Sequence, residues 1–292
     1  MDTRNCKLLT SFVLALSAFA LGGGPAPDRV VVVPVANMYS SPSASSDVVS
    51  QAILGSNVVT LQKKGKWVKA QTSDQYTGWI EKRALRDAKN SSYATTGDTV
   101  QVTSLFANVY RETDVTAHAP IVTLPFESRV ELIGHGSNDN GRWLQIRLPD
   151  KQTGWIQSGD VSANPKILTI PESIELAKRF LGIPYLWGGR SSFGYDCSGF
   201  TQMLVRSRGI YMPRDADVQA SWTGVMPVDR KDLQAGDLLF FGSSPQKITH
   251  TGMYIGNGEF IHDTTNTHPV VQISQIDEEP WTHLLVASRR VK

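Results

Sequence analysis

An internal repeat in the first half of the chain is the strongest constraint on its fold. The first copy carries ANMY, GKWV and TGWI, and the second carries ANVY, GRWL and TGWI (residues 36–39, 65–68 and 77–80; 107–110, 141–144 and 153–156). Three motifs that recur in the same order indicate two copies of one small structural unit. We therefore expect residues 30–86 and 100–161 to fold alike.

Each copy has the pattern of short strands. Runs rich in β-branched and aromatic residues are separated by Gly, Ser, Asp and Pro; in the first copy they are Val30–Val35, Val58–Lys63, Trp67–Thr72 and Gly78–Glu81. Units of this size built from such runs predict small antiparallel barrels. The neighbours of Trp79 and Trp155 alternate as in a strand, so these two tryptophans are expected in the cores.

After Pro171 the pattern changes to helices followed by strands. Apolar residues at helical spacing predict helices over Glu172–Leu181 and Cys197–Arg208, with Asp196 as the N-cap of the second. The strand-like runs that follow are Asp237–Phe241, Thr249–Ile255, Glu259–His262, Val270–Ile273 and Leu284–Ser288. Helices first and strands afterwards predict an α+β domain, which we place at 165–292.

The N-terminus has the pattern of an export signal. Arg4 and Lys7 precede an apolar run, Leu8–Leu21, and Ala18-Phe19-Ala20 suits signal cleavage, so we assign 1–20 to a signal peptide. We expect an exported protein, periplasmic or extracellular, with no membrane span once this segment is removed. The net charge of +2 argues against a nucleic-acid partner. Removal of Cys6 with the signal would leave Cys197 as a lone thiol.

The position of Cys197 suggests a nucleophile. At the first turn of a helix, free N–H groups and the helix dipole favour a thiolate. His250 and His262 lie on two strand-like runs joined by the turn Gly256-Asn257-Gly258, so a hairpin would bring the two imidazoles together. A cysteine, a histidine base and a third polar group that orients the base form a nucleophilic triad. The spacing of these three residues matches no compact zinc pattern, and we expect no metal or cofactor.

Five ordered blocks then match a known family. They are PYLWGG (184–189), DCSGF (196–200), PR (213–214), GDLLFF (236–241) and HTGMYIG (250–256). Over about 171–292 they resemble the NlpC-type cell-wall cysteine peptidases, and the paired GxW and TGWI motifs resemble bacterial SH3-like domains found beside such enzymes. The resemblance implies a papain-like catalytic domain with Cys197 as nucleophile, His250 as base, His262 as third polar group and Tyr185 near the oxyanion.

The same resemblance implies a substrate. The family cuts peptidoglycan stem peptides, often between D-γ-glutamate and a diamino acid, and members with SH3-like domains bind the free amine of an N-terminal L-Ala. We therefore expect a thiol protease that acts as a monomer on L-Ala-D-γ-Glu-diamino acid. The substrate-binding candidates are Asp196, Ser198, Tyr76, Arg214 and Asp215. Asp196 could instead serve only as a helix cap, and Asp215 could cap the short helix expected near Val218–Trp222.

Two other functions stay open at this stage. The SH3-like repeats could grip the cell wall, and the enzyme would then hydrolyse intact peptidoglycan. A non-catalytic wall-binding protein with an inactive peptidase domain is the second alternative. It predicts that the cysteine or the histidine is missing, whereas both are present.

Overall fold

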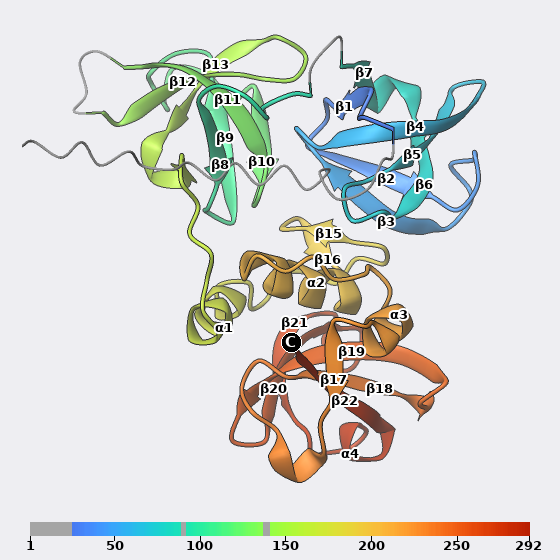
Figure 1. Ribbon diagram of the computed structural model, residues 1–292. Helices are drawn as coiled ribbons and strands as arrows, with labels where there is room; N and C mark the ends of the chain where they lie inside the picture. The colour runs from blue at the N-terminus through green and yellow to red at the C-terminus, as the bar shows by residue number, and fades with distance from the viewer. Residues whose placement is uncertain (1–24, 89–91, 137–140) are drawn as a thin grey trace, which may run out of the picture.

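The computed structural model describes residues 25–88, 92–136 and 141–292. The expected signal peptide therefore lies outside the described residues. Three large sheets organise the described part of the chain, two seven-stranded sheets in the first half and one six-stranded sheet in the second, and the second half also has a two-stranded sheet (Figure 1). The two β-rich units lie side by side, and both face the part of the second half that carries its helices (Figure 1).

The first two sheets have the same topology. The first contains β1 (Arg29–Val31), β2 (Val35–Tyr39), β3 (Val48–Ile53), β4 (Asn57–Lys64), β5 (Trp67–Gln71), β6 (Thr77–Glu81) and β7 (Leu85–Asp87). The second contains β8 (Thr99–Val102), β9 (Phe106–Tyr110), β10 (Val122–Pro125), β11 (Arg129–His135), β12 (Trp143–Arg147), β13 (Thr153–Gln157) and β14 (Val161–Ser162). The strand orders are β3-β2-β6-β5-β4-β1-β7 and β10-β9-β13-β12-β11-β8-β14, so each strand has a counterpart seven places later.

Equivalent aromatic residues pack in the same way in both units. Tyr39 meets Trp67 edge to face at 5.3 Å between ring centroids, and Tyr110 meets Trp143 at 5.6 Å. Trp79 is buried and Trp155 is half-buried. These pairs explain why the repeated motifs contain both a tyrosine and a tryptophan, because edge-to-face aromatic pairs add stability beyond the area they bury.

One expected strand of the first unit is broken in the structure. The run Val30–Val35 divides into β1 and β2, which belong to opposite parts of the sheet. Pro34 lies at the break and has no N–H to donate to a neighbouring strand, so the chain turns there while the Pro34 carbonyl accepts from Leu54.

The second half is the expected α+β domain. Its helices are α1 (Ile170–Lys178), α2 (Cys197–Ser207), α3 (Ala216–Ser221) and α4 (Trp281–Leu284). Its strands are β15 (Arg190–Ser191), β16 (Gly194–Tyr195), β17 (Val225–Pro227), β18 (Leu238–Ser244), β19 (Lys247–Gly256), β20 (Glu259–Thr264), β21 (Val270–Gln275) and β22 (Leu285–Val291). Strands β17 to β22 form one antiparallel sheet in the order β17-β22-β18-β19-β20-β21.

Local signals explain where the first helix begins. Thr169 and Glu172 form a reciprocal capping box, so α1 begins two residues before the expected Glu172. It ends at Lys178, and Gly182 then adopts a positive φ of 85°. The chain therefore leaves the helix three residues earlier than the apolar pattern suggested.

The second β-rich unit contributes to the core of the second half. Phe126, from the turn between β10 and β11, packs edge to face on Phe180, which contacts Tyr195 and Phe200 in the same way. The Phe126 N–H also donates to Ser192 Oγ at 2.9 Å. The unit is thus joined to the α+β domain by buried contacts as well as by the polypeptide.

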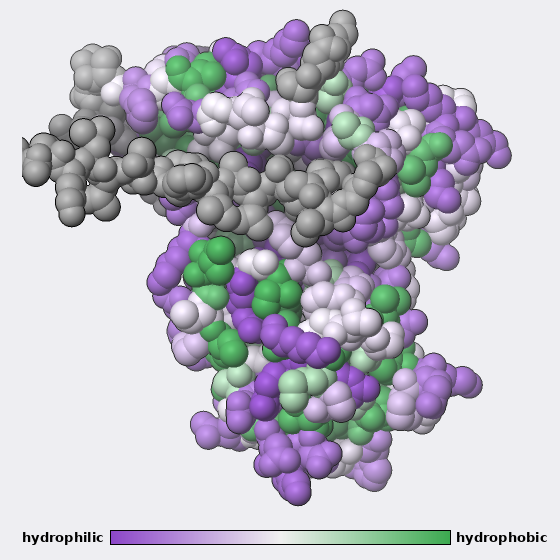
Figure 2. Space-filling view, viewed as in Figure 1, coloured by the Kyte–Doolittle hydropathy of each residue, from purple (hydrophilic) through white to green (hydrophobic). Residues whose placement is uncertain are grey.

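The visible surface differs between the two halves. Hydrophilic residues dominate the face of the β-rich units, whereas apolar residues gather over the half that contains α1 and α2 (Figure 2). A groove of about 670 Å³ lies beside α1, between that helix and Ile255. Within the described residues, no helix is long and apolar enough to cross a membrane.

Candidate active site

Cys197 is the first residue of α2, as the sequence predicted. The carboxylate of Asp196 caps this helix by accepting from the Gly199 N–H at 2.7 Å. Gly199 has to be a glycine, because a Cβ there would lie 2.2 Å from the carbonyl oxygen of Gly189. The close approach of these two backbones holds the start of α2, and with it the cysteine, against the preceding loop.

The resting thiol of Cys197 is protonated, contrary to the expected thiolate. Burial and the neighbouring Asp196 carboxylate raise the pKa of Cys197 to about 12. The backbone N–H groups of Thr251 and Ser198 face the sulfur and oppose this rise. The helix terminus therefore acts in the expected direction, but burial and the adjacent negative charge outweigh it.

The two histidines of the hairpin form a hydrogen-bonded chain. Strands β19 and β20 pair antiparallel around the Gly256-Asn257-Gly258 turn. His250 Nε2 lies 2.7 Å from His262 Nδ1, and His262 Nε2 lies 3.0 Å from Ser274 Oγ. His250 Nδ1 has no hydrogen-bond partner in the described part of the chain, so this atom is free to take a proton. Thr251, the residue after His250, presents its N–H to the cysteine, which places β19 beside the start of α2.

An aromatic wall keeps both imidazoles neutral. Trp281 contacts His250 and His262 at centroid distances of 5.1 and 4.8 Å, and Phe260 lies 4.4 Å from His262. Burial lowers the pKa of His250 to about 3 and also lowers the pKa of His262. The resting site therefore pairs a neutral thiol with a neutral base, and charge separation has to accompany the attack on a substrate.

Tyr185 lies at the same site. Burial raises the pKa of its hydroxyl, and the proximity of the ionisable groups of Cys197, Asp196 and Asp263 raises it further. The Tyr185 N–H donates to Pro269 O at 2.8 Å, which ties the residue to the segment between β20 and β21. The phenol therefore stays protonated and able to donate a hydrogen bond beside the cysteine.

Asp263, which follows His262, is a buried carboxylate that the sequence analysis did not single out. Its side chain is fully buried, and neither oxygen makes a well-formed hydrogen bond among the residues described. Burial, with a contribution from Asp196, raises the pKa of Asp263 to about 8, and the backbone N–H groups of Thr264 and Tyr195, which face the carboxylate, partly oppose this rise. The native protein therefore holds a proton here that the unfolded chain, with an aspartate pKa of about 3.9, releases.

The raised pKa of Asp263 predicts how the stability of the protein depends on pH. Because the native state binds more protons than the unfolded state between about pH 4 and 8, Asp263 makes the protein less stable as pH rises through that range. We expect Asp263→Asn to raise the unfolding free energy by about 2–5 kcal/mol at pH 8.5 and by much less at pH 5. Urea unfolding at both pH values measures this, with Asp47→Asn at an exposed carboxylate as control. An equal gain at both values would contradict the raised pKa.

Asp196 has a second partner that the sequence did not reveal. The Arg214 guanidinium donates two hydrogen bonds to it, from Nη1 to Oδ1 at 2.9 Å and from Nη2 to Oδ2 at 2.7 Å. Arg214 also donates to Ser198 Oγ at 2.7 Å and to Gly189 O at 3.1 Å. The Gly188 N–H donates to Asp196 Oδ2 as well. The carboxylate is thus fully occupied as a cap and as the counter-ion of Arg214.

Tyr76 and Asp215 meet at the boundary of the two halves. The Tyr76 hydroxyl lies near the Asp215 carboxylate, and burial followed by that negative charge raises the pKa of Tyr76 to about 12. Asp215 occupies the N-cap position of α3, but its side chain makes no capping bond, so the capping role that the sequence also allowed is not formed. Burial raises the pKa of Asp215, while Arg214 and Tyr76 oppose the rise. Both residues line a groove of about 460 Å³.

The sequence singled out the cysteine and both histidines of this site, but not the residues that hold the histidines in place. Ser274 and Trp281 lie on later elements whose pairing only the fold reveals. Ser274 is a polar residue in the alternating run Val270–Gln275, which was its only signal.

Family models agree with this architecture. Residues 182–290 match the NlpC/P60 family, 38–85 match the bacterial dipeptidyl-peptidase Sh3 domain, and 87–162 match the GW (Gly-Tryp) dipeptide domain. A gamma-D-glutamyl-L-lysine dipeptidyl-peptidase from Bacillus subtilis is 31% identical over 82% of this chain and 80% of its own length.

The chain belongs to the NlpC/P60 family. It is therefore a member of a family of cysteine peptidases, preceded by SH3-like domains.

Two further proteins resemble this NlpC/P60 protein over most of its length. A protein of the same name from Bacillus cereus is 35% identical over 73% of this chain and 66% of its own length. The crystal structure of an NlpC/P60 family protein from Bacillus cereus superimposes with a TM-score of 0.78 at 26% identity, covering 90% of this chain and 99% of that one. These relatives and the SH3-like domains associate the enzyme with peptides derived from peptidoglycan.

Proposed function

We propose that this enzyme hydrolyses the bond between D-γ-glutamate and the diamino acid in stem peptides that begin with a free L-Ala. The observation that carries the proposal is the Tyr76–Asp215 pair: a phenol and a carboxylate from two domains line one groove together with Arg214, which binds the Asp196 carboxylate next to Cys197. A carboxylate that lacks a capping role and lines a groove suits an ammonium group. The names of the relatives from Bacillus support the same bond specificity.

In this mechanism the triad acts through a concerted proton transfer. The Cys197 sulfur attacks the γ-carbonyl carbon of D-glutamate while its proton passes to His250 Nδ1. The resulting imidazolium is held through His262 and Ser274. Tyr185 and the N–H groups at the start of α2 would stabilise the oxyanion. The carbon–nitrogen bond then breaks as His250 returns the proton to the leaving amine, and water hydrolyses the thioester.

Two sets of residues divide substrate recognition: Asp215 with Tyr76 at the amine, and Arg214 with Ser198 at the glutamate part. Asp196 and Arg214 neutralise one another, so the carboxylate left for the L-Ala ammonium group is Asp215, with Tyr76 beside it. The role first expected of Asp196 therefore passes to Asp215. Asp196 orients Arg214 and Ser198, which we place at the glutamate part of the substrate.

Acetylating the substrate amine tests this proposal directly. We expect N-acetylation of L-Ala-D-γ-Glu-L-Lys to lower kcat/KM about 100-fold, because acetylation removes the charge and leaves Asp215 unpaired. The measurement compares both peptides, and meso-diaminopimelate in place of lysine reports the preferred diamino acid. Equal cleavage of the free and acetylated peptides would contradict recognition of the amine. Faster release of fragments from intact sacculi than from free peptides would instead support a cell-wall hydrolase.

A further inference from the structure

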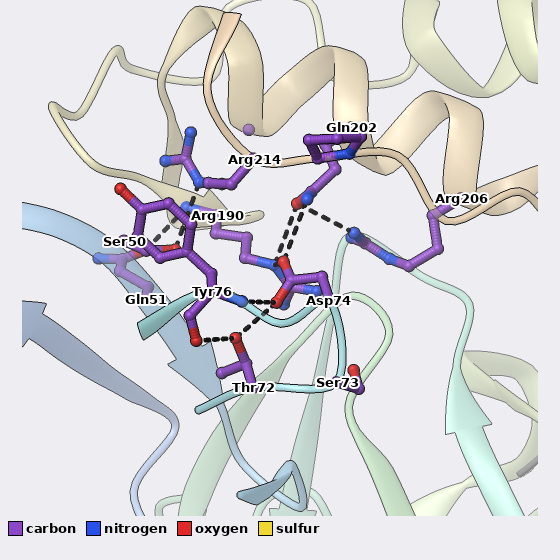
Figure 3. Close-up of polar contacts among 12 residues, drawn as sticks. Ser50, Gln51, Thr72, Ser73, Asp74, Tyr76, Arg190, Gln202, Arg206 and Arg214 are labelled. Carbon is purple, nitrogen blue, oxygen red and sulfur yellow. Dashed lines mark hydrogen bonds and ion pairs between the residues drawn. The ribbon is translucent and has the colours of Figure 1, made fainter. Parts of the chain in front are cut away.

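A buried polar cluster joins both SH3-like domains to the helix that carries Cys197. We name Asp74, Glu127, Arg190, Gln202 and Arg206 the interdomain cluster. Asp74 comes from the turn between β5 and β6, Glu127 from the turn between β10 and β11, and Gln202 and Arg206 from α2 (Figure 3 shows Asp74 with the residues around it). The cluster thus brings one acidic turn from each SH3-like domain onto α2.

Asp74 is the member that links the first domain to α2. Its side chain is 6% exposed. One oxygen, Oδ2, accepts from Gln202 Nε2 at 3.0 Å and lies 3.8 Å from Arg190 Nε. The other, Oδ1, accepts from the Thr72 hydroxyl and from the Tyr76 N–H. Although burial opposes ionisation, Arg190 and these bonds hold the pKa of Asp74 below its usual value, so it is a carboxylate.

The turn that Asp74 anchors leads directly into Tyr76. The Thr72 N–H donates to the Tyr76 carbonyl at 3.0 Å, and the Thr72 hydroxyl, whose one hydrogen goes to Asp74, lies 3.2 Å from the same carbonyl. Gln75 adopts a positive φ of 66°, which closes the turn tightly. From this turn the Tyr76 ring extends toward Arg214 (Figure 3). A single residue, Gln75, therefore separates Asp74, which is bonded to Gln202 of α2, from Tyr76.

Glu127 makes a comparable contact that does not lead to the substrate site. It binds Arg206 with two bonds, Nε to Oε1 at 2.9 Å and NH2 to Oε2 at 2.5 Å. Its turn leads to Phe126 and the hydrophobic core instead of to Tyr76. Asp74 and Glu127 are thus two buried acids that contact the same helix, α2, and only Asp74 belongs to the turn that carries Tyr76.

We propose that Asp74 is a positioning residue that sets the place of the Tyr76 hydroxyl over the substrate amine. This inference rests on the proposed recognition of a free N-terminal L-Ala. Asp74 touches no reacting atom, and its effect passes through the Thr72–Tyr76 turn. The first SH3-like domain accordingly acts as part of the specificity site of the peptidase.

A double-mutant cycle between Asp74→Asn and Tyr76→Phe tests the proposal. Asparagine keeps the shape but places an NH₂ group or a neutral oxygen against Gln202 and Arg190, which weakens the anchor. We expect each single variant to lower the preference for the free over the acetylated peptide about tenfold, mainly through KM. The double variant should lower it no further than Tyr76→Phe alone, because both changes remove the same contact.

Glu127→Gln is the matched control within the same cluster. We expect it to lower the melting temperature as much as Asp74→Asn does, but to leave the preference for the free amine unchanged. Hydrogen–deuterium exchange should speed up in residues 72–76 in Asp74→Asn and not in Glu127→Gln. Additive effects in the double variant, or an equal loss of preference in Glu127→Gln, would overturn the role of Asp74. If the unmodified enzyme shows no preference for the free amine, the proposed function itself is wrong.

Discussion

Replacing Cys197 by alanine is expected to lower kcat/KM on L-Ala-D-γ-Glu-L-Lys by at least about 10⁴-fold. In the mechanism proposed above no other group supplies the nucleophile, and removing such a group from a triad leaves only the contributions of binding and of the oxyanion site. The fold should persist, because the cap of α2 is formed by Asp196 and Gly199 and not by the thiol. Steady-state kinetics and a thermal melt check both statements.

Binding provides the control for this variant. Calorimetry should show that Cys197→Ala still binds the dipeptide L-Ala-D-γ-Glu, since the groups proposed to hold it are unchanged. A variant that keeps more than about a hundredth of the original kcat/KM would refute Cys197 as the nucleophile.

Replacing Arg214 by methionine is expected to cost about 3–5 kcal/mol of unfolding free energy. Arg214 is 1% exposed in its side chain, and its loss leaves the Asp196 carboxylate buried without its counter-ion. The variant should also lose activity, because Ser198 and the start of α2 are held by the same guanidinium. Chemical denaturation measures the loss of stability.

Two further variants separate the causes of that loss. Arg214→Met combined with Asp196→Asn should regain part of the stability, because the orphaned charge is gone. Arg230→Met, which breaks an ion pair at the surface with Asp277, should cost less than about 1 kcal/mol. If Arg214→Met proves no more destabilising than Arg230→Met, the buried ion pair does not have the importance assigned to it here.

Features encoded in local sequence were predicted well. The repeat determined the two SH3-like units because each motif fixes a strand and its aromatic partner, as in the Tyr39–Trp67 contact. The hairpin of His250 and His262 followed from a turn of Gly-Asn-Gly, whose positive φ values at all three positions only such residues adopt readily. In both cases the deciding residues lie within one element or one turn.

Features that depend on distant packing were not predicted. The sequence predicted an ionised Cys197 because the helix terminus is a local signal. Burial by the surrounding domain, which raises the pKa of the thiol, cannot be seen in the local sequence. Three contacts join segments that are far apart in the sequence: Ser274 with His262, Trp281 with His250, and Arg214 with Asp196. The contact between Asp74 and Gln202 spans two domains, and no sequence motif predicts it.

The central claim is that Cys197 forms a thioester with the D-γ-glutamyl carbonyl of a peptide that begins with free L-Ala. Acid quenching during the first turnovers, followed by mass spectrometry of the tryptic peptide that contains Cys197, tests this claim most directly. We predict an L-Ala-D-γ-Glu acyl group on Cys197 that hydroxylamine removes and that fails to form with the N-acetylated peptide. Product formation with Cys197 unmodified at every time, or an acyl group on another residue, would contradict it.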